Sequence, residues 1–433
     1  MKEQQSIPVT KVARSAKFVK TGFQVGGNYI KHYSKKLFNP DLSRDQLNED
    51  NAEDIYNSLS ELKGSALKIA QMLSMDKNIL PRAYTDKFTQ AQYSAPPLSG
   101  PLIIRTFTKL FGKTPGEIFD EFNLQSENAA SIGQVHKAKL NGKQLAIKIQ
   151  YPGVGDSISS DLKLVKPFAF RLLGMSEKEL NVYIKEVEER LLEETNYELE
   201  VQQSIEISKA CSNLENVVFP TYYPELSGHR VITMDWINGL HLKEFLQTNP
   251  SQELRNKIGQ AMWDFYNFQQ HELRKVHADP HPGNFLITPD EKLAVIDFGC
   301  IKGIPDDFYY PFFSLISANV LADKEKTIKT FRELEMIWPS DSPIQIEFYY
   351  QAYREMIELF ARPYASETFD FSKNEYIESL YEYGEKLTKV PELKQARGVK
   401  HFIYVNRTNF GLYNILHDLG AQVQTNKFKP HIS

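Results

Sequence analysis

One stretch constrains this chain more than any other: residues 277–299, which read HADPHPGNFLITPDEKLAVIDFG. It opens with His277-x-Asp279, continues to Asn284, and closes with Asp297-Phe-Gly. A carboxylate can accept the proton of a hydroxyl group, whereas a carboxamide and a second carboxylate supply the hard oxygen ligands that Mg²⁺ prefers. The stretch therefore indicates phosphoryl-transfer chemistry, with Asp279 as the base-like residue and Asn284 and Asp297 as metal ligands.

The spacing of the two motifs makes the pattern specific, because an isolated Asp-Phe-Gly is more often a solvated turn. Here two apolar runs, Phe285–Ile287 and Leu293–Ile296, stand between the motifs and flank a Thr-Pro-Asp-Glu turn. Such a pattern predicts a β-hairpin. Catalytic loop, strand pair and metal-binding turn follow one another in this order in kinases.

Composition excludes several classes of protein. A chain of 433 residues with 41% apolar and 24% charged residues is large enough for two or three globular lobes. Its net charge of −4 argues against a nucleic-acid partner, and two cysteines are too few for a disulfide framework or a zinc site. No apolar run approaches the roughly twenty residues of a transmembrane helix. No apolar signal sequence follows Met1, so we expect a cytoplasmic protein.

The first 37 residues predict a basic amphipathic segment. They contain eight Lys or Arg and one acid, Glu3. Apolar side chains recur at helical spacing, and Gly26-Gly27 is expected to break the helix midway. The apolar positions are Val12, Ala16, Val19, Phe23, Ile30, Tyr33 and Leu37. Two interpretations remain open: this stripe packs on the body of the protein, or it lies on an anionic membrane surface, with the protein peripheral to the membrane.

Residues 53–75 have the clearest helical periodicity, with one apolar stripe that includes Ile55 and Leu59. Lys68 and Gln71 lie one turn apart beside this stripe. They are either a solvated polar edge or part of a site. A linker is expected at residues 95–101, because three prolines there disfavour a continuing helix.

Strands are expected after the linker. Residues 135–140 and 144–150 flank an Asn-Gly turn, which predicts a hairpin. The small residues at 128–134 would let backbone N–H groups approach a phosphate, although they do not form a Gly-x-Gly-x-x-Gly loop. The candidate contacts to a nucleotide in this region are Ala129, Ala130, Ser131, Gly133 and Val135.

Alternation in strand 144–150 puts Lys148 beside the small Ala146, on the face opposite Ile147. Lys148 also ends a Leu-Ala-Ile-Lys run that matches the lysine strand of kinases. Residues 176–206 are rich in helix formers and can supply an acid for Lys148. A last strand at 230–237 leads into a hinge, whose backbone at Asp235 and Ile237 would contact the edge of an adenine ring.

After Asp297 the chain runs directly into aromatic, helical sequence. No long Ser- and Thr-bearing activation loop and no Ala-Pro-Glu motif follow. This argues against a conventional protein kinase, because no platform for a peptide substrate is evident. We interpret Cys300 and the aromatic residues between Phe369 and Phe410 as packing residues.

Four motifs in order give the chain a resemblance to the UbiB/AarF family of atypical kinase-like proteins, from about Ile55 to beyond Asp306. They are Lys-x-x-Gln at 68–71, AASIGQVHKA at 129–138, ETNYELE at 194–200, and HADPHPGN with VIDFG. The resemblance implies an α+β, protein-kinase-like bilobal fold, with a small antiparallel β lobe, a helical lobe and an N-terminal helical extension over the active site. It also implies binding of ATP or ADP with Mg²⁺, and a role in isoprenoid quinone or other lipid metabolism.

By position, the resemblance makes Lys148 the phosphate-binding lysine and Glu200 its ion-pair partner. Lys68 and Gln71 would then enter the nucleotide site, with Lys68 meeting Glu194. The chain departs from the family pattern at three positions, where the family has glycine, an acid and usually alanine. These are Ala70, Asn196 and Asn128. Asn196 lacks the charge of the acid, and this departure bears on the geometry of the extension more than on nucleotide binding.

The expected division is a basic segment at 1–45, a helical extension at 46–95, a kinase-like N-lobe at 102–238 and a helical C-lobe at 239–433. Three functions are compatible with the sequence. The first is an ATP-dependent enzyme acting on a small or lipid-like acceptor, such as a quinone precursor. The second is a nucleotide-gated scaffold that assists membrane lipid enzymes without transferring phosphate. The third is a small-molecule kinase like the aminoglycoside phosphotransferases, which gives the Lys68 helix no role. The acceptor, the partner proteins and the oligomeric state are not determined by the sequence.

Overall fold

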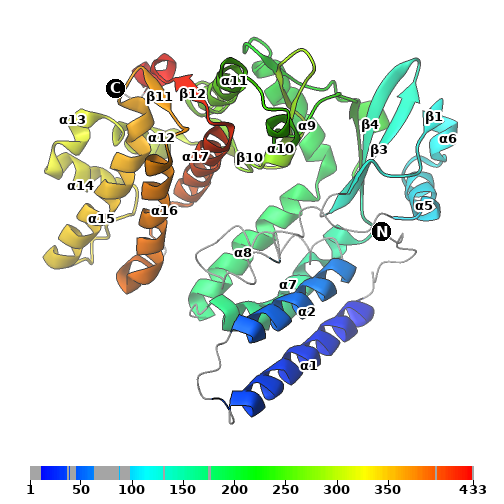
Figure 1. The fold of residues 1–433 in the computed structure, drawn as a ribbon, viewed down its shortest axis with the longest axis horizontal. Helices are drawn as coiled ribbons and strands as arrows, with labels where there is room; N and C mark the ends of the chain where they lie inside the picture. The colour runs from blue at the N-terminus through cyan, green and yellow to red at the C-terminus, as the bar shows by residue number, and fades with distance from the viewer. Residues whose placement is uncertain are drawn as a thin grey trace. The chain divides into compact units, whose positions relative to one another are not determined.

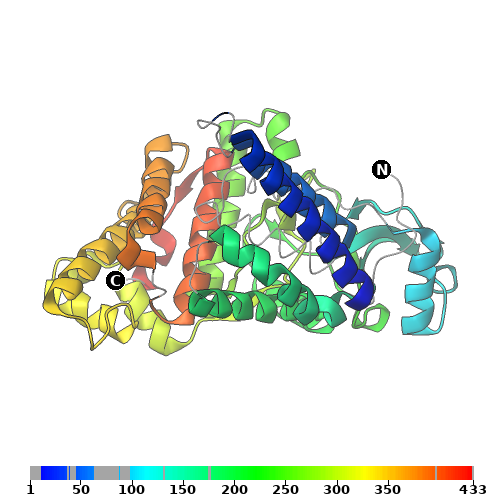
Figure 2. The same ribbon diagram turned by 90° about the horizontal axis from the view of Figure 1, so that it is seen from below.

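The computed structural model describes residues 11–36, 39, 45–62, 87, 98–129, 132–173, 177–394 and 397–431 (Figures 1 and 2). The chain forms two compact units. The first unit consists of Met1–Val201 with Thr221–Trp236, and the second of Gln202–Pro220 with Ile237–Ser433. The first unit holds an antiparallel sheet with flanking helices, whereas the second is mostly helical. The expected α+β class is confirmed.

The sheet of the first unit is built on the predicted hairpin. Its strands run in the order β1-β3-β4-β6, with β2 paired to β3, and all are antiparallel. They are β1 (Glu121–Phe122), β2 (Asn128–Ala129), β3 (Gly133–Leu140), β4 (Lys143–Gln150) and β6 (Val231–Asp235). Asn141 and Gly142 turn the chain between β3 and β4 with φ of 51° and 79°. This is the left-handed geometry that an Asn-Gly hairpin turn requires.

The helices of the first unit differ from the sequence predictions at two places. They are α1 (Lys11–Lys36), α2 (Asp45–Leu62), α5 (Gly100–Phe111), α6 (Pro115–Ile118), α7 (Val154–Leu173), α8 (Glu177–Glu194) and the start of α9 (Tyr197–Ala210), with a 3₁₀ turn at Pro224–Leu226. The expected linker at 95–101 overlaps a helix, because α5 begins at Gly100 with Pro101 in its first turn, where a missing N–H costs nothing. The expected break at Gly26-Gly27 is wrong, since α1 is continuous.

Contacts on both sides of the glycine pair explain why α1 stays helical. Thr21 and Ser58 form a hydrogen bond through their hydroxyl groups, and the Asn28 amide donates to Asp54 at 2.8 Å. Both bonds join α1 to α2, and the two helices run side by side in Figures 1 and 2. Tertiary contacts therefore override the low helix propensity of glycine.

The second unit surrounds one long buried helix, α11 (Gln252–His271), whose Trp263, Phe265 and Tyr266 are fully buried. Its other helices are α10 (Leu242–Gln247), α12 (Asp306–Ser314), α13 (Ala318–Leu321), α14 (Lys324–Glu333), α15 (Pro343–Ala361), α16 (Asn374–Lys389) and α17 (Lys400–Leu419). Short 3₁₀ turns lie at Pro282–Asn284, Arg362–Tyr364, Pro391–Lys394 and Asn426–His431. The buried rings of Phe371 and Tyr413 pack against Trp263, and Phe371 agrees with the packing role expected for the aromatic residues between Phe369 and Phe410.

The strands of the second unit are short, and the segments between them hold Asp279, Asn284 and Asp297. β5 (Val217–Val218), β8 (Phe285–Ile287) and β9 (Leu293–Val295) form one sheet, in which β8 and β9 are the predicted hairpin. β7 (Lys275–His277) pairs with β10 (Ile301–Gly303), and β11 (Thr368–Asp370) with β12 (Gln422–Gln424). No helix in the described part of the chain is long and apolar enough to cross a membrane.

Candidate active site

The first unit contains a lysine–glutamate pair linking its sheet to α9. The Nζ atom of Lys148, on β4, lies 2.7 Å from Oε1 of Glu200. The two side chains are 13% and 4% exposed. Lys148 stands opposite Val135 on β3 and Ile232 on β6, so strands on both sides fix its position. The structure therefore brings together the two residues that the family resemblance pairs.

Tyr197, which the sequence analysis did not single out, lies beneath this lysine. Its ring centroid is 5.2 Å from Nζ of Lys148, within the range of a cation–π interaction, and the side chain is fully buried. Its hydroxyl lies close to the start of β3, because a Cβ atom added to Gly133 would be 2.8 Å from it and 2.6 Å from the carbonyl O of Ile149. Only glycine fits at position 133, where β3, β4 and α9 meet.

The motif residues that follow Gly133 are structural. Gln134 is fully buried; its Oε1 accepts a hydrogen bond from the Leu98 N–H at 2.8 Å, and its amide nitrogen lies 2.7 Å from Nε2 of His136. Nδ1 of His136 lies 2.8 Å from the carbonyl O of Asn123. These partners fit a neutral ring that donates through Nδ1. Burial lowers the pKa of His136, which keeps the ring neutral.

Asn196 interrupts the helical segment expected at 176–206 and caps the second of two helices. Its side-chain oxygen accepts from the Leu199 N–H at 3.1 Å, and its carbonyl from the Glu200 N–H at 3.0 Å. Asn is among the best N-cap residues, so it serves the cap as well as an acid would. One departure from the family pattern thus has a local structural role: it starts the helix that carries Glu200.

The candidate hinge residues Asp235 and Ile237 are only partly buried. The Asp235 carboxylate accepts hydrogen bonds from the Tyr223 hydroxyl at 2.7 Å and the Thr221 N–H at 3.2 Å. Burial would raise the pKa of Asp235, but these hydrogen bonds outweigh burial and hold the pKa below its usual value. Ile237, the first residue of the second unit after the hinge, is half-buried.

The remaining candidates of the first unit divide by whether the structure describes them. Ala129 lies at the end of β2, Val135 is half-buried on β3, and Ala146 is buried on β4. Glu194 is buried in the last turn of α8. Four candidates lie outside the described residues: Lys68, Gln71, Ala130 and Ser131.

In the second unit, backbone hydrogen bonds hold the His-x-Asp-x-x-x-x-Asn motif. After β7, the Ala278 N–H donates to the carbonyl O of Cys300 at 2.8 Å. The amide nitrogen of Asn284 donates to the carbonyl O of Asp279 at 2.9 Å, which ties the two ends of the loop together. Since this bond uses Nδ2, the Oδ1 atom of Asn284 is the one oriented as an oxygen ligand.

The Asp-Phe-Gly turn is bonded directly to this loop. The Ile296 N–H donates to the carbonyl O of Asn284 at 3.0 Å, so Asp297 follows a residue already fixed to Asn284. Oδ1 of Asp297 accepts the Gly299 N–H at 2.8 Å. The Phe298 ring packs edge-on to the buried His277 ring, with centroids 6.0 Å apart. The two motifs therefore form one unit of structure.

Asp279 has a buried aromatic neighbour in α11, Tyr266. Burial raises the pKa of the Tyr266 hydroxyl well above its usual value, and the negative charge of Asp279 raises it further. Tyr266 is thus a neutral phenol whose pKa responds to the charge of the candidate base.

Asn284 and Asp297 fit a magnesium ion that is shared with a nucleotide. Among the described residues no group of three or more His, Cys, Asp or Glu side chains could hold a metal, so no all-protein cage is present there. Mg²⁺ commonly takes only one or two carboxylates and completes its shell with waters and substrate phosphates. The two oxygen-bearing side chains, joined through the Asn284–Ile296 backbone bond, match that requirement.

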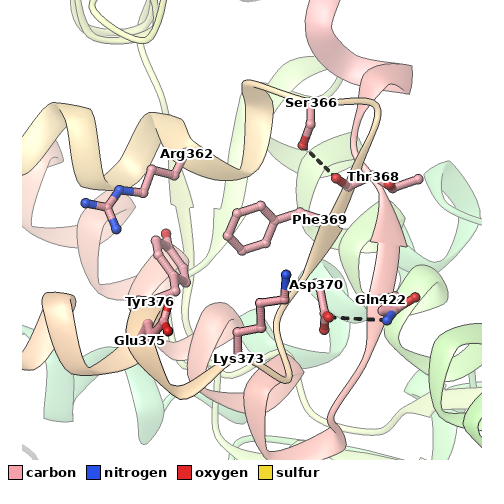
Figure 3. Close-up of a pocket in the computed structure, with 9 residues that line it drawn as sticks. All are labelled: Arg362, Ser366, Thr368, Phe369, Asp370, Lys373, Glu375, Tyr376 and Gln422. Atoms are coloured by element: carbon pink, nitrogen blue, oxygen red, sulfur yellow. Dashed lines mark hydrogen bonds between the residues drawn. The ribbon is translucent and has the colours of Figure 1, made fainter.

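A separate hollow of about 450 Å³ lies in the C-terminal part of the second unit (Figure 3). Its lining comes from the 3₁₀ turn after α15, from β11 and β12, and from the start of α16, and includes Arg362, Phe369, Asp370 and Lys373. Both cations are exposed, and Asp370 already accepts from Ser372 and Gln422. No motif residue lines this hollow, so it is not part of the candidate site.

A comparison with models of known domain families shows which family this chain belongs to. A model of the ABC1 atypical kinase-like domain matches residues 90–331, more than half of the chain. The chain belongs to this family. The UbiB/AarF resemblance is thereby confirmed, since relatives of this ABC1-family chain include an aarF domain-containing protein kinase of Arabidopsis thaliana, 29% identical over 73% of this chain.

Two further relatives cover most of the chain. The atypical kinase COQ8B of Danio rerio, named as mitochondrial, is 28% identical over 87% of this chain. A solved structure of Rv3197 with erythromycin, from Mycobacterium tuberculosis, has a TM-score of 0.60 and 26% identity, and covers 89% of this chain and 96% of its own. The chain spans 62% of the zebrafish protein and 45% of the Arabidopsis protein. The kinase-like fold and family are therefore shared with these proteins.

Proposed function

We propose that this ABC1-family chain is an ATP-binding enzyme that hydrolyses ATP or transfers its terminal phosphoryl group to a small or lipid-like acceptor. The observation that carries the proposal is the largely buried pair of Lys148 and Glu200. Withdrawing such charges from water costs several kcal/mol, so a gain in the stability of the fold does not by itself account for a buried pair of this kind. Kinases use the same pair to present an ammonium group to nucleotide phosphates.

Each motif residue has one role in the proposed reaction. Lys148 binds phosphate oxygens while Glu200 holds its ammonium group in place. Asn284 and Asp297 hold Mg²⁺, which neutralises charge on the phosphates when it is bound. Asp279 orients an acceptor hydroxyl or water and accepts its proton. The oxygen so activated bonds to the terminal phosphorus, the bond from that phosphorus to the bridging oxygen breaks, and ADP leaves.

The COQ8B relative supports a link to isoprenoid quinone or other lipid metabolism, as the UbiB/AarF resemblance implied. An acceptor with a long apolar portion would fit an enzyme that works at a membrane. We therefore propose a lipid or quinone precursor as the class of acceptor, with no nucleic-acid partner.

The test compares Mg²⁺-dependent nucleotide binding and ATP turnover of the purified protein with those of Asp297→Asn. Asp290→Asn is the matched control, because Asp290 lies in the exposed turn of the same hairpin and forms an ion pair with Lys292 outside the motifs. Turnover lost in the first variant and kept in the second supports the enzyme. Tight binding without turnover favours the nucleotide-gated scaffold, and absence of nucleotide binding overturns the proposal.

A Lys68→Ala variant separates the two enzyme proposals. Loss of nucleotide binding or turnover supports the role in the nucleotide site that the UbiB/AarF resemblance gives to Lys68. Unchanged binding and turnover favour a small-molecule kinase like the aminoglycoside phosphotransferases.

We further propose that α1 contacts an anionic membrane surface. The face of α1 that packs on the protein is polar: Arg14 forms a buried ion pair with Asp161 of α7, and Asn28 bonds to α2. The apolar stripe points outward, since Phe23 is 79%, Ile30 71% and Val19 57% exposed. Packing of this stripe on the described body of the protein was the other interpretation, and these exposures oppose it.

Charge and spacing support a lipid partner for the stripe. α1 has no Asp or Glu, and the exposed Lys20 and Lys31 lie beside the stripe on the helix. A helix with an apolar face bordered by lysines binds in the plane of an anionic membrane interface. The protein would then be peripheral to the membrane.

Flotation with vesicles tests this contact on the full chain. We expect binding to phosphatidylglycerol vesicles, weaker binding at high salt, and loss of binding in Phe23→Asp with Ile30→Asp. Ile344→Asp is the control, because Ile344 is 84% exposed in the second unit. The proposal is contradicted if the parent protein and both variants bind phosphatidylglycerol vesicles equally. It is also contradicted if the parent protein binds only phosphatidylcholine vesicles.

A further inference from the structure

Side chains from two helices form hydrogen bonds with the segment that contains Asp279. The His277 N–H donates to Oε1 of Gln269, on α11, at 3.1 Å. The Thr408 hydroxyl, on α17, lies 3.4 Å from the carbonyl O of His277 and 2.9 Å from that of Tyr404, so its proton is shared between them. Gln269 and Thr408 are both fully buried. Both backbone groups of His277 are therefore paired with buried side chains.

The other end of this segment rests on the backbone of α17. A Cβ atom added to Gly411 would lie 2.7 Å from Cβ of Pro280 and 3.3 Å from its carbonyl O. Real Cβ atoms do not approach that closely, so the helix and the loop touch only because residue 411 is glycine. Gly411 follows Thr408 by three positions, which places both on one face of the helix.

We infer that α17, which lies beyond the region matched by the family model, positions Asp279 through Thr408 and Gly411. This inference rests on the proposed function and deepens it by naming two positioning residues. One face of α17 contacts His277 on one side of Asp279 and Pro280 on the other. A general base must lie within hydrogen-bond reach of its proton, and a displacement of about 1 Å can cost about 10²-fold in rate.

The first test compares Gly411→Ala with Gly259→Ala. Gly259 lies on α11 in the same unit and also has a close contact, since its Cβ would be 2.5 Å from Cβ of Ala421, which is not a motif residue. Both variants should lose thermal stability. Only Gly411→Ala should lower kcat, by at least about 10-fold, with the nucleotide Kd changed less than about 2-fold. Equal kcat values in the two variants overturn the inference.

A second pair guards against a Gly411 variant that does not fold. Thr408→Val and Thr425→Val each remove a buried hydroxyl bonded to a backbone carbonyl, since Thr425 donates to the Ser366 carbonyl at 2.8 Å. We expect kcat to fall only in Thr408→Val and to recover in Thr408→Ser. A kcat that falls equally in both valine variants assigns Thr408 a general structural role and overturns the inference.

Hydrogen exchange separates this inference from the proposed function. Peptides covering residues 277–285 should exchange faster in Gly411→Ala and Thr408→Val than in the two controls. Faster exchange in a protein without turnover upholds the role of α17 while the proposed enzyme fails. Turnover in the parent protein, with unchanged exchange and kcat in both variants, upholds the enzyme and overturns the role of α17.

Discussion

The two units hold their motif residues by different means. In the first unit, Lys148 and Glu200 meet as side chains from a strand and a helix, with the Tyr197 ring under the ammonium group. In the second unit, Asn284 and Asp297 are held by hydrogen bonds to the backbone. The Ile296 N–H donates to the carbonyl O of Asn284, the Asn284 amide donates to the carbonyl O of Asp279, and Asp297 accepts from the Gly299 N–H. Removing a charge should therefore cost stability in the first unit, whereas in the second it should change the chemistry and leave the structure intact.

The largest effect should come from Asp279→Asn in the second unit. The substitution keeps the size of the side chain but removes the base, and general base catalysis contributes about 10²–10⁴-fold. We expect turnover to fall by about 10³-fold, in the middle of that range, with almost no change in thermal midpoint, because Asp279 is held through its backbone carbonyl. Steady-state kinetics and thermal unfolding measure both. A large fall in midpoint would contradict the backbone-held loop.

The next largest effect should be on stability in the first unit. Glu200→Ala leaves the Lys148 ammonium largely buried without its partner, and breaking a buried pair costs about 3 kcal/mol or more. Glu121→Ala breaks the exposed Lys139–Glu121 pair of the same sheet and should cost less than about 1 kcal/mol. Denaturant unfolding of both variants measures the two losses in the free energy of unfolding. Equal losses would show that burial of the pair is unimportant.

A smaller effect should follow from removing the cap of the helix that carries Glu200. Asn196→Ala loses the bond to the Leu199 N–H and should cost about 1 kcal/mol. Asn196→Asp keeps the cap and should be as stable as the parent protein. Hydrogen exchange at the start of α9 would locate the change. Destabilisation by aspartate as large as that by alanine would contradict the capping role.

The smallest effect concerns pH. Burial lowers the pKa of His136, whereas an unfolded histidine titrates near about 6.5. The unfolded chain therefore binds a proton that folded His136 resists, so the first unit should lose stability as pH falls below about 6.5. His136→Asn should flatten this dependence of the thermal midpoint, and the control His229→Asn, at an exposed position, should not. An unchanged slope in His136→Asn would exclude His136 as the source.

Much of the local structure could be predicted from the sequence. The β3–β4 and β8–β9 hairpins were predicted because alternation and turn residues are local signals. The pairing of Lys148 with Glu200 was expected from the resemblance, through motif order, and not from periodicity. The helix α5 was missed because three prolines were taken to mark a linker, although Pro101 is favourable in the first turn of a helix.

The sequence by itself determined the two hairpins, the motif residues and the amphipathic pattern of α1, because spacing along the chain encodes them. The α+β class was expected from the family resemblance. Only the tertiary structure decided which residues these segments contact. Periodicity identifies the apolar side of α1 but not which side packs, and the structure packs the polar side through Arg14. Likewise Tyr197 under Lys148, and Gly411 against Pro280, depend on close approach between segments distant in sequence. Such contacts are set by the shape of the packed chain, which no local pattern records.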